Sequence, residues 1–146
     1  MNLKLEGKNV IITGGSDGIG KETARIMAEE GANVIIFARN IENLNNTKDS
    51  IKGITGKEVD TYSVDVKNEK NVKETVAKVV EKYGNIDILV NNAGTSSAHP
   101  IMNITDEIMN EDLGTKLFGA IYMIQAVVPS MKTNKKTLKI TEIGRL

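Results

Sequence analysis

Apolar residues recur along the chain in short β-branched runs, and most runs are followed by a longer stretch with helical spacing. Three of the runs are almost uninterrupted, which is typical of strands buried on both faces of a sheet. Another run is more polar and alternates, and we expect it at a sheet edge. Charged residues weaken the strand prediction for the last run. The pattern predicts five strands, at residues 9–13, 33–38, 58–66, 86–90 and 138–143.

Between these runs, apolar residues spaced three and four apart predict four helices, at residues 18–30, 40–52, 68–83 and 105–128. The third is the clearest, with lysines and glutamates on its polar face. The fourth is the longest, and Pro129 is predicted to interrupt it. One side of this helix carries Leu113, Leu117, Ile121, Ile124 and Val128. Strict alternation of strands and helices predicts an α/β fold with a parallel sheet and crossover helices.

Length and composition predict one ordinary globular domain, residues 1–146. Nineteen basic and nineteen acidic residues cancel, which argues against nucleic acid and anionic membranes as partners. The absence of cysteine excludes a disulfide framework and a thiolate site, and a single histidine, His99, cannot form a zinc site alone. No stretch resembles a signal peptide or a membrane span, so a soluble cytoplasmic protein is expected.

A glycine-rich segment, residues 13–20, lies where the first strand passes into the first helix. Glycines at such a turn permit unusual backbone angles, close approach of a phosphate and close packing of helix on strand. The helix start also directs unpaired N–H groups and a positive dipole at a bound anion. The context therefore predicts a nucleotide-phosphate site; a glycine-rich turn without a ligand is the alternative.

A second phosphate motif overlaps the first. Gly15, four further residues and then Gly20 and Lys21 fit the start of a P-loop. The P-loop needs serine or threonine next, because that hydroxyl binds Mg²⁺. Glu22 occupies this position and would instead add negative charge beside a triphosphate. A P-loop phosphotransferase is therefore a weaker hypothesis than a dinucleotide-binding protein.

Two motifs resemble those of the short-chain dehydrogenase/reductase (SDR) family. Thr13-Gly14-x-x-x-Gly18-Ile19-Gly20 is similar to its cofactor motif, and Asn91-Asn92-Ala93-Gly94 is similar to its second hallmark. The resemblance covers nearly the whole chain. It implies an α/β Rossmann-type doubly wound parallel sheet, truncated after the fifth strand, that binds a nicotinamide dinucleotide. The cofactor-binding residues expected on this basis are Thr13, Gly14, Ser16, Asp17, Gly18, Ile19, Gly20, Arg39, Asp65, Val66, Asn92, Ala93 and Gly94.

The choice of cofactor depends on the end of the second strand, where an acid would bind a ribose 2′-hydroxyl and a cation a 2′-phosphate. The strand ends with Arg39, whose planar guanidinium suits phosphate. NADP(H) is therefore favoured over NAD(H), with Asp17 in the glycine loop as the main point against it. Asp65 is expected, by resemblance, to bind the adenine amino group, although a helix cap or a solvated carboxylate is the other interpretation.

The family's chemistry is hydride transfer between nicotinamide and a carbonyl or alcohol, with a tyrosine and a lysine four residues later. None of the chain's three tyrosines, at positions 62, 83 and 122, has that lysine. Lys116 and Arg145 stand where the resemblance expects the family's asparagine and serine. No catalytic residue is therefore assigned, and we expect a truncated and inactive amino-terminal portion of such an oxidoreductase.

The sequence does not distinguish a truncated gene from a frameshift or a fragment, and it does not identify the substrate. A non-catalytic nucleotide-binding module is the alternative function. A sheet that stops after a fifth strand has an open edge, and the apolar side of the long helix lacks a partner. These two features predict a homo-oligomer.

Overall fold

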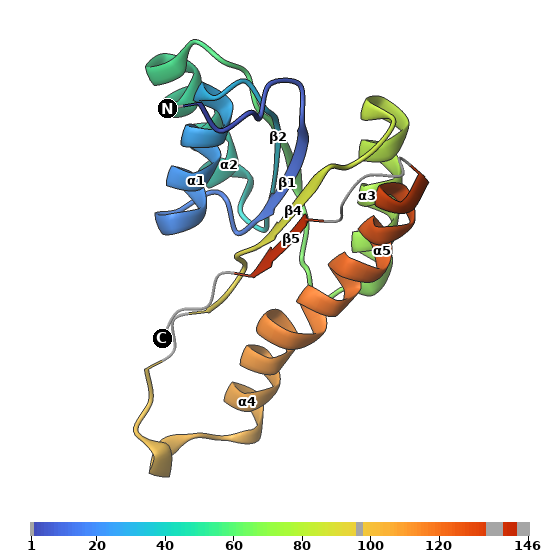
Figure 1. Ribbon diagram of the computed structural model, residues 1–146. Coiled ribbons are helices and arrows are strands. Elements are labelled where there is room, and N and C mark those ends of the chain that lie inside the picture. Colours follow the sequence, from blue (N-terminus) through green and yellow to red (C-terminus); the bar gives the residue numbers. More distant parts are fainter. Residues whose placement is uncertain (1, 96–97, 134–138, 143–146) are drawn as a thin grey trace.

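The computed structural model describes residues 2–95, 98–133 and 139–142. Within these ranges, five parallel strands form one sheet in the order β3-β2-β1-β4-β5, with helices on both faces (Figure 1). The strands are β1 (Asn9–Thr13), β2 (Asn33–Ala38), β3 (Asp60–Ser63), β4 (Ile88–Asn91) and β5 (Lys139–Glu142). The helices are α1 (Gly18–Glu29), α2 (Ile41–Thr55), α3 (Glu69–Tyr83), α4 (Asp106–Leu113) and α5 (Gly119–Thr133), with short helical turns η1 (Ile101–Asn103) and η2 (Gly114–Phe118).

The predicted α/β class and parallel sheet are confirmed. β1 is central and pairs in parallel with β2 on one side and β4 on the other; Val10 stands opposite both Val34 and Ile88. Because consecutive strands run parallel, each connection crosses a face of the sheet, and the helices occupy those crossovers. The carboxyl ends of the strands therefore share one edge, which in open α/β sheets is the ligand-binding edge.

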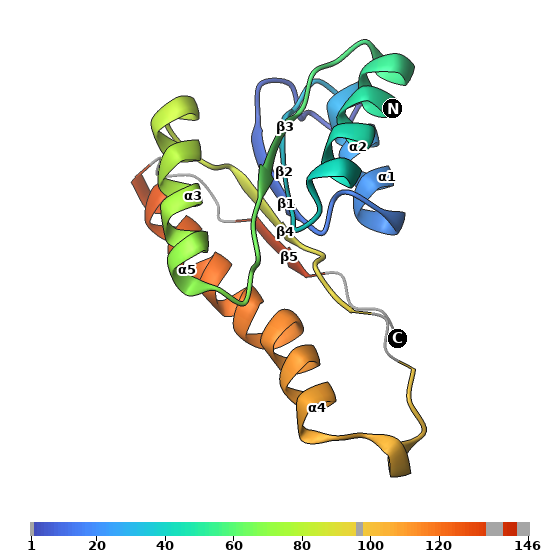
Figure 2. The same cartoon turned by 180° about the vertical axis from the view of Figure 1, so that it is seen from behind.

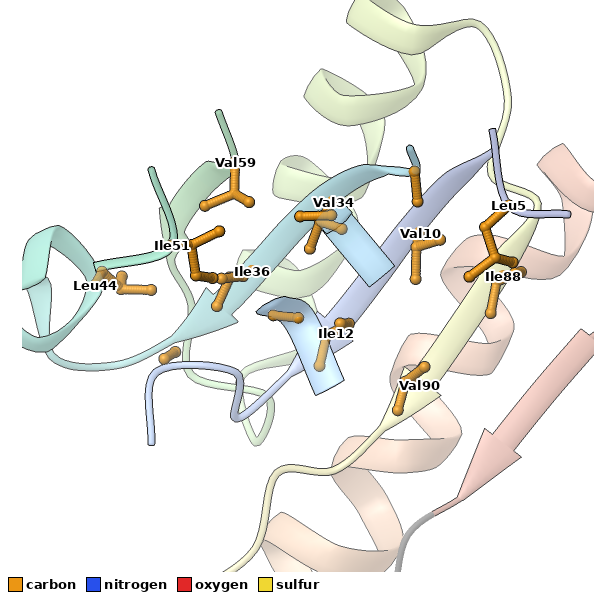
Figure 3. Packing of buried hydrophobic residues seen from close by; sticks show 14 residues of the cluster. Leu5, Val10, Ile12, Val34, Ile36, Leu44, Ile51, Val59, Ile88 and Val90 are labelled. Atoms are coloured by element: carbon orange, nitrogen blue, oxygen red, sulfur yellow. The ribbon is translucent and has the colours of Figure 1, made fainter. Parts of the chain in front are cut away.

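Alternating side chains along the buried strands supply two separate cores. Val10 and Ile12 face the α1–α2 side, whereas Ile11 faces the α3–α5 side. Figure 3 shows the first core, in which Val34 and Ile36 of β2 lie beside Val10 and Ile12 of β1. Every residue of β1 is buried, as the uninterrupted apolar run predicts. On the other face α3 and α5 lie side by side (Figure 2).

The third strand is shorter than the prediction of residues 58–66. Ladder pairing runs only from Asp60 opposite Ile35 to Ser63 opposite Ala38, where β2 itself ends. β3 lies at the edge of the sheet and, within the described residues, pairs with β2 alone, so the end of β2 sets the carboxyl end of β3. Val59 and Val64, on either side of the ladder, are buried nevertheless.

The long helix also differs from the prediction. A π-helical turn, η2, joins α4 to α5, and α5 continues through Pro129 to Thr133. Proline cannot donate to the carbonyl four residues earlier, which here belongs to Gln125. Both Pro129 and Gln125 are exposed, so water can satisfy that carbonyl, and the predicted interruption at Pro129 is wrong.

The side of α5 that faces the sheet and α3 carries Met123, Val127 and Met131, all buried. Upstream, α4 and η1 extend beyond the body of the molecule (Figure 1). Large apolar side chains on α4, η2 and the first turn of α5 are exposed: Met109, Leu113, Leu117, Phe118 and Ile121. The expected exposed apolar side is thus confirmed for Leu113, Leu117 and Ile121, but not for Ile124, which packs against the α3–α5 core. No helix among the described residues combines the length and the apolar character needed to cross a membrane.

Candidate cofactor-binding site

The glycine loop connects β1 to α1 at the carboxyl edge of the sheet. Gly14 donates its N–H to the carbonyl of Phe37 at 2.7 Å, which fastens the loop to the end of β2. Gly14 and Gly18 have φ values of +66° and +51°, a region that side chains disfavour. The loop thus has the strand–turn–helix context and the backbone angles that the motif predicts.

Close packing explains why the loop carries further glycines. The side-chain amide of Asn92 donates to the carbonyl of Gly14 at 2.9 Å. A Cβ on Gly20 would overlap both of these groups, and a Cβ on Gly14 would lie 2.8 Å from the Cα of Ala93. Gly15, which was not predicted as a site residue, packs against Ile36 in the same way. The glycine loop and the Asn92–Ala93 segment therefore form one interlocked unit.

Thr13 completes this unit from the end of β1. Its hydroxyl oxygen accepts the N–H groups of Asn92 at 3.1 Å and Ala93 at 3.0 Å. The same hydroxyl lies 3.5 Å from the carbonyl of Val90, to which it donates. Thr13 is almost fully buried, so the segment that follows β4 is held by a polar group within the protein.

Asp17 caps the first helix and accepts the N–H of Gly18 at 2.8 Å. Both residues are exposed, so the helix start is open to solvent. The Asp17 carboxylate places a negative charge at the positive end of α1, where an anion would otherwise bind. A bound pyrophosphate would have to share this end of the helix with Asp17.

Arg39 follows β2 directly, and its side chain is 60% exposed. Its guanidinium Nη1 lies 3.5 Å from Oε1 of Glu111 on α4. The Asp65 carboxylate accepts the N–H of Lys67 at 3.0 Å in a local turn, as the alternative interpretation of this residue expects. Val66 is buried, and a Cβ on Gly119 would lie 2.6 Å from its Cγ2.

The remaining predicted residues lie around the same loop. The carbonyl of Ser16 accepts a hydrogen bond from Thr47 at 3.0 Å, so α2 also supports the loop. Ile19, in the first turn of α1, is 49% exposed. Gly94 is exposed, and a Cβ there would lie 3.7 Å from Cε of Lys116. Every predicted cofactor residue is thus within the described part of the chain, at or near the carboxyl edge of the sheet.

Glu111 and Lys67 were not predicted as site residues. Lys67 donates to Oε2 of Glu111 at 2.5 Å, so one carboxylate contacts cations that follow two different strands. Nothing in the local sequence of α4 indicates this contact, because it depends on the tertiary fold. Lys116 lies 3.5 Å from Asp112, which also bonds the Thr95 hydroxyl.

The tyrosines lie away from the glycine loop. Tyr83 donates its hydroxyl to Asp60 at 2.7 Å, and burial together with this bond raises its pKa. The ring of Tyr62 packs edge-on against Phe37, and Tyr122 packs against the α3–α5 core. A tyrosine that transfers protons at neutral pH needs a lowered pKa, which is the opposite of the shift at Tyr83. Arg145 lies outside the described residues.

The residues present fit a dinucleotide. The carboxyl edge offers an open helix start for a pyrophosphate, a glycine loop with backbone angles that side chains disfavour, and a cation after β2. The short chain dehydrogenase family profile matches residues 8–143. The chain belongs to this family. The SDR resemblance inferred from residues 13–20 and 91–94 is therefore confirmed, and the P-loop reading has no support from it.

Relatives of this SDR chain include several reductases. It is 41% identical over 129 residues to the 3-oxoacyl-[acyl-carrier-protein] reductase FabG of Thermotoga maritima, covering 88% of this chain and 52% of the relative. It is 35% identical over 135 residues to the 3-dehydrosphinganine reductase TSC10A of Arabidopsis thaliana, covering 92% and 40%. The chain thus spans about half the length, or less, of these two curated relatives.

Solved SDR structures share the fold. L-sorbose reductase from Gluconobacter frateurii, complexed with NADPH and L-sorbose, has a TM-score of 0.88 and 34% identity over 97% of this chain and 54% of its own. A metagenomic short-chain oxidoreductase in complex with NADP has a TM-score of 0.89 and 27% identity, covering 97% and 64%. The Rossmann-type fold is therefore confirmed, and nicotinamide cofactors occur in these neighbours.

Proposed function

We propose that this chain is the cofactor-binding portion of an SDR oxidoreductase that prefers NADP(H) to NAD(H). The observation that carries the proposal is the interlocked unit of the glycine loop and residues 92–93 at the carboxyl edge of the sheet. The bound dinucleotide supplies hydride transfer between its nicotinamide and a carbonyl or alcohol. This chain's own part is to hold the cofactor and to distinguish its two forms.

Each predicted residue has a distinct task in this proposal. The N–H groups at the start of α1, from Gly18 onward, receive the pyrophosphate, and Gly20 allows the glycine loop to pack against Asn92. Asp65 and Val66 border the adenine, and Asn92, Ala93 and Gly94 border the part of the cofactor nearer the nicotinamide. Arg39 receives the 2′-phosphate through its guanidinium. β2 carries no acidic residue that would repel this phosphate.

Titration of the protein with NADPH and NADH tests the proposal. We expect NADPH to bind more tightly, and Arg39→Ala to weaken NADPH selectively, because a charge-assisted hydrogen bond contributes roughly 1.5–3 kcal/mol. Arg25→Ala is the matched control: Arg25 pairs with Glu22 and Glu29 on α1, and its loss should leave both affinities unchanged. Equal affinities in the unmodified protein, or tighter NADH, would overturn the assignment of Arg39.

We propose further that these 146 residues alone catalyse no carbonyl reduction. Tyr83 is bonded to Asp60, and neither Tyr62 nor Tyr122 has a lysine four residues later. Steady NADPH consumption with a panel of ketones would contradict this. NADPH binding without turnover would support it, while binding of neither dinucleotide would favour a scaffold without a nucleotide. Cytoplasmic localisation also remains a prediction.

A further inference from the structure

One carboxylate of α4 joins the residues that follow β2 and β3. Glu111 Oε1 lies 3.5 Å from Arg39 Nη1, and Glu111 Oε2 accepts from Lys67 Nζ at 2.5 Å. The backbone of Arg39 is held in place, since Ser63 Oγ donates to its carbonyl at 3.1 Å. The end of β2 therefore lacks an acid in the sequence but has one beside it in the fold.

The two cations hold Glu111 unequally. Lys67 makes the shorter contact, and its side chain is only 28% exposed. The aliphatic part of the Lys67 side chain packs against η2, since a Cβ on Gly114 would lie 3.0 Å from Lys67 Cδ. Arg39 makes the longer contact with a side chain that is 60% exposed. Lys67 thus fixes the carboxylate, and Arg39 is the partner that can exchange it for another anion.

We propose that Glu111 is a specificity-determining residue, which competes with a 2′-phosphate for Arg39 and so reduces the preference for NADP over NAD. This inference rests on the proposed function. A 2′-phosphate that pairs with Arg39 must displace Glu111 and then remains close to that fixed negative charge. A cofactor with a free 2′-hydroxyl brings no such charge, and an acid is the side chain that suits it. Glu111 therefore acts against one cofactor and not the other.

The stability of the fold gives little reason for a glutamate at position 111. Both ion pairs of Glu111 are at least partly open to water, and such pairs contribute little to folding, because water screens them and two long side chains must be ordered. Replacing Glu111 with glutamine keeps the shape of the side chain and removes its charge. The variant Glu111→Gln is thus expected to fold, and its effect should lie in ligand affinity.

The test uses two ligands that differ only in the decisive group: adenosine 2′,5′-bisphosphate and adenosine 5′-monophosphate. Calorimetric titration should show the 2′-phosphate ligand binding Glu111→Gln about tenfold more tightly than the unmodified protein, since a like charge near the site is gone. Affinity for the 5′-monophosphate should stay within about twofold. NADPH and NADH should repeat this pattern, and the gain should shrink at high salt.

Glu58→Gln is the matched control, because Glu58 forms an equally short 2.5 Å pair with Lys52 just ahead of β3, at the amino-end edge of the sheet. It should change neither affinity. In the Arg39→Ala background the gain from Glu111→Gln should shrink, because the contested guanidinium is missing and only the relief of repulsion between Glu111 and the 2′-phosphate remains. An undiminished gain there, or an unchanged ratio in Glu111→Gln alone while both cofactors bind, overturns the competition and leaves the proposed function intact. Failure of the unmodified protein to bind any of these ligands overturns the proposed function and this inference together.

Discussion

The buried hydroxyl of Thr13 accepts the N–H of Asn92 at 3.1 Å and thereby joins the end of β1 to the segment that follows β4. The N–H of Ala93 shares the same acceptor at 3.0 Å. Two loops of the site, far apart in sequence, are thus positioned by one side-chain oxygen. Its removal should affect both the stability of the fold and the shape of the site.

Thr13→Val keeps the size of the side chain but leaves two N–H groups without their acceptor. We expect a loss of roughly 2–3 kcal/mol in the free energy of unfolding, because unsatisfied buried donors are costly. Thr13→Ser keeps the hydroxyl and should cost only about 1 kcal/mol for the missing methyl group. Chemical denaturation of the three proteins checks this order. A valine variant as stable as the serine variant would contradict the role given to the hydroxyl.

Gly18→Val should abolish dinucleotide binding while most of the fold remains. The φ of Gly18 is +51°, which a β-branched residue resists, so the substitution should distort the helix start that is proposed to receive the pyrophosphate. Gly56→Val is the matched control, since Gly56 has a φ of +70° at the end of α2, with open space around it. It should cost similar stability without any loss of affinity. Retained cofactor binding in Gly18→Val would show that the loop is only a turn.

The fold was predictable where local pattern decides it. The strands β1 and β2 are continuous β-branched runs that are buried on both faces, and the caps Asn40 and Asn68 bond the helix starts as their residue type predicts. The errors occurred where tertiary surroundings decide. The carboxyl end of β3 follows from the end of its partner β2, and Pro129 is tolerated because its side of α5 faces water.

The candidate site divides in the same way. Gly14, Gly18 and Asn92 were found because the turn chemistry of a strand–helix junction leaves a local signature. Glu111 was not found, since its contact with Arg39 depends on where the tertiary fold places α4. A sequence search for an acid directly after β2 tests for the correct chemistry. It covers only residues that are close in the chain, however, and Glu111 is not among them.

The hydrogen bond between Tyr83 and Asp60 predicts that the stability of the protein depends on pH. Burial alone would raise the pKa of Asp60, but hydrogen bonds from Lys82 and Tyr83 outweigh it and hold this pKa below its ordinary value of 3.8. Because the folded pKa is the lower one, the stabilisation is complete above the unfolded pKa and is lost as pH falls through the folded pKa. Tyr83→Phe should cost about 0.5–1.5 kcal/mol at neutral pH, the usual contribution of one such bond.

Denaturation at several pH values provides the check. The difference between the unmodified protein and Tyr83→Phe should narrow below about pH 4, once Asp60 is protonated in the unfolded chain. At the alkaline end, the raised pKa of Tyr83 means that its contribution persists up to the ordinary tyrosine range and then declines. A difference that stays constant from acid to neutral pH would show that the Asp60 carboxylate is not the partner that matters.

The exposed apolar side of α4 and η2 predicts self-association. Leu113 and Leu117 are each 48% exposed and lie four residues apart on the helix, and Phe118 and Ile121 continue the surface. Within the described residues β5 pairs with β4 alone, so an open sheet edge accompanies this apolar side. A second copy of the chain offers the same apolar surface, and burying it against itself removes it from water.

Leu113→Glu and Leu117→Glu should therefore shift the protein towards monomers, because each would place a charge in the contact. Sedimentation velocity or light scattering over a range of concentrations measures the change. Ile54→Glu is the control, since Ile54 is 65% exposed on α2, away from this helix. If the unmodified protein is a stable monomer at high concentration, the apolar side of α4 does not mediate self-association. If Ile54→Glu dissociates it equally well, the contact involves another surface.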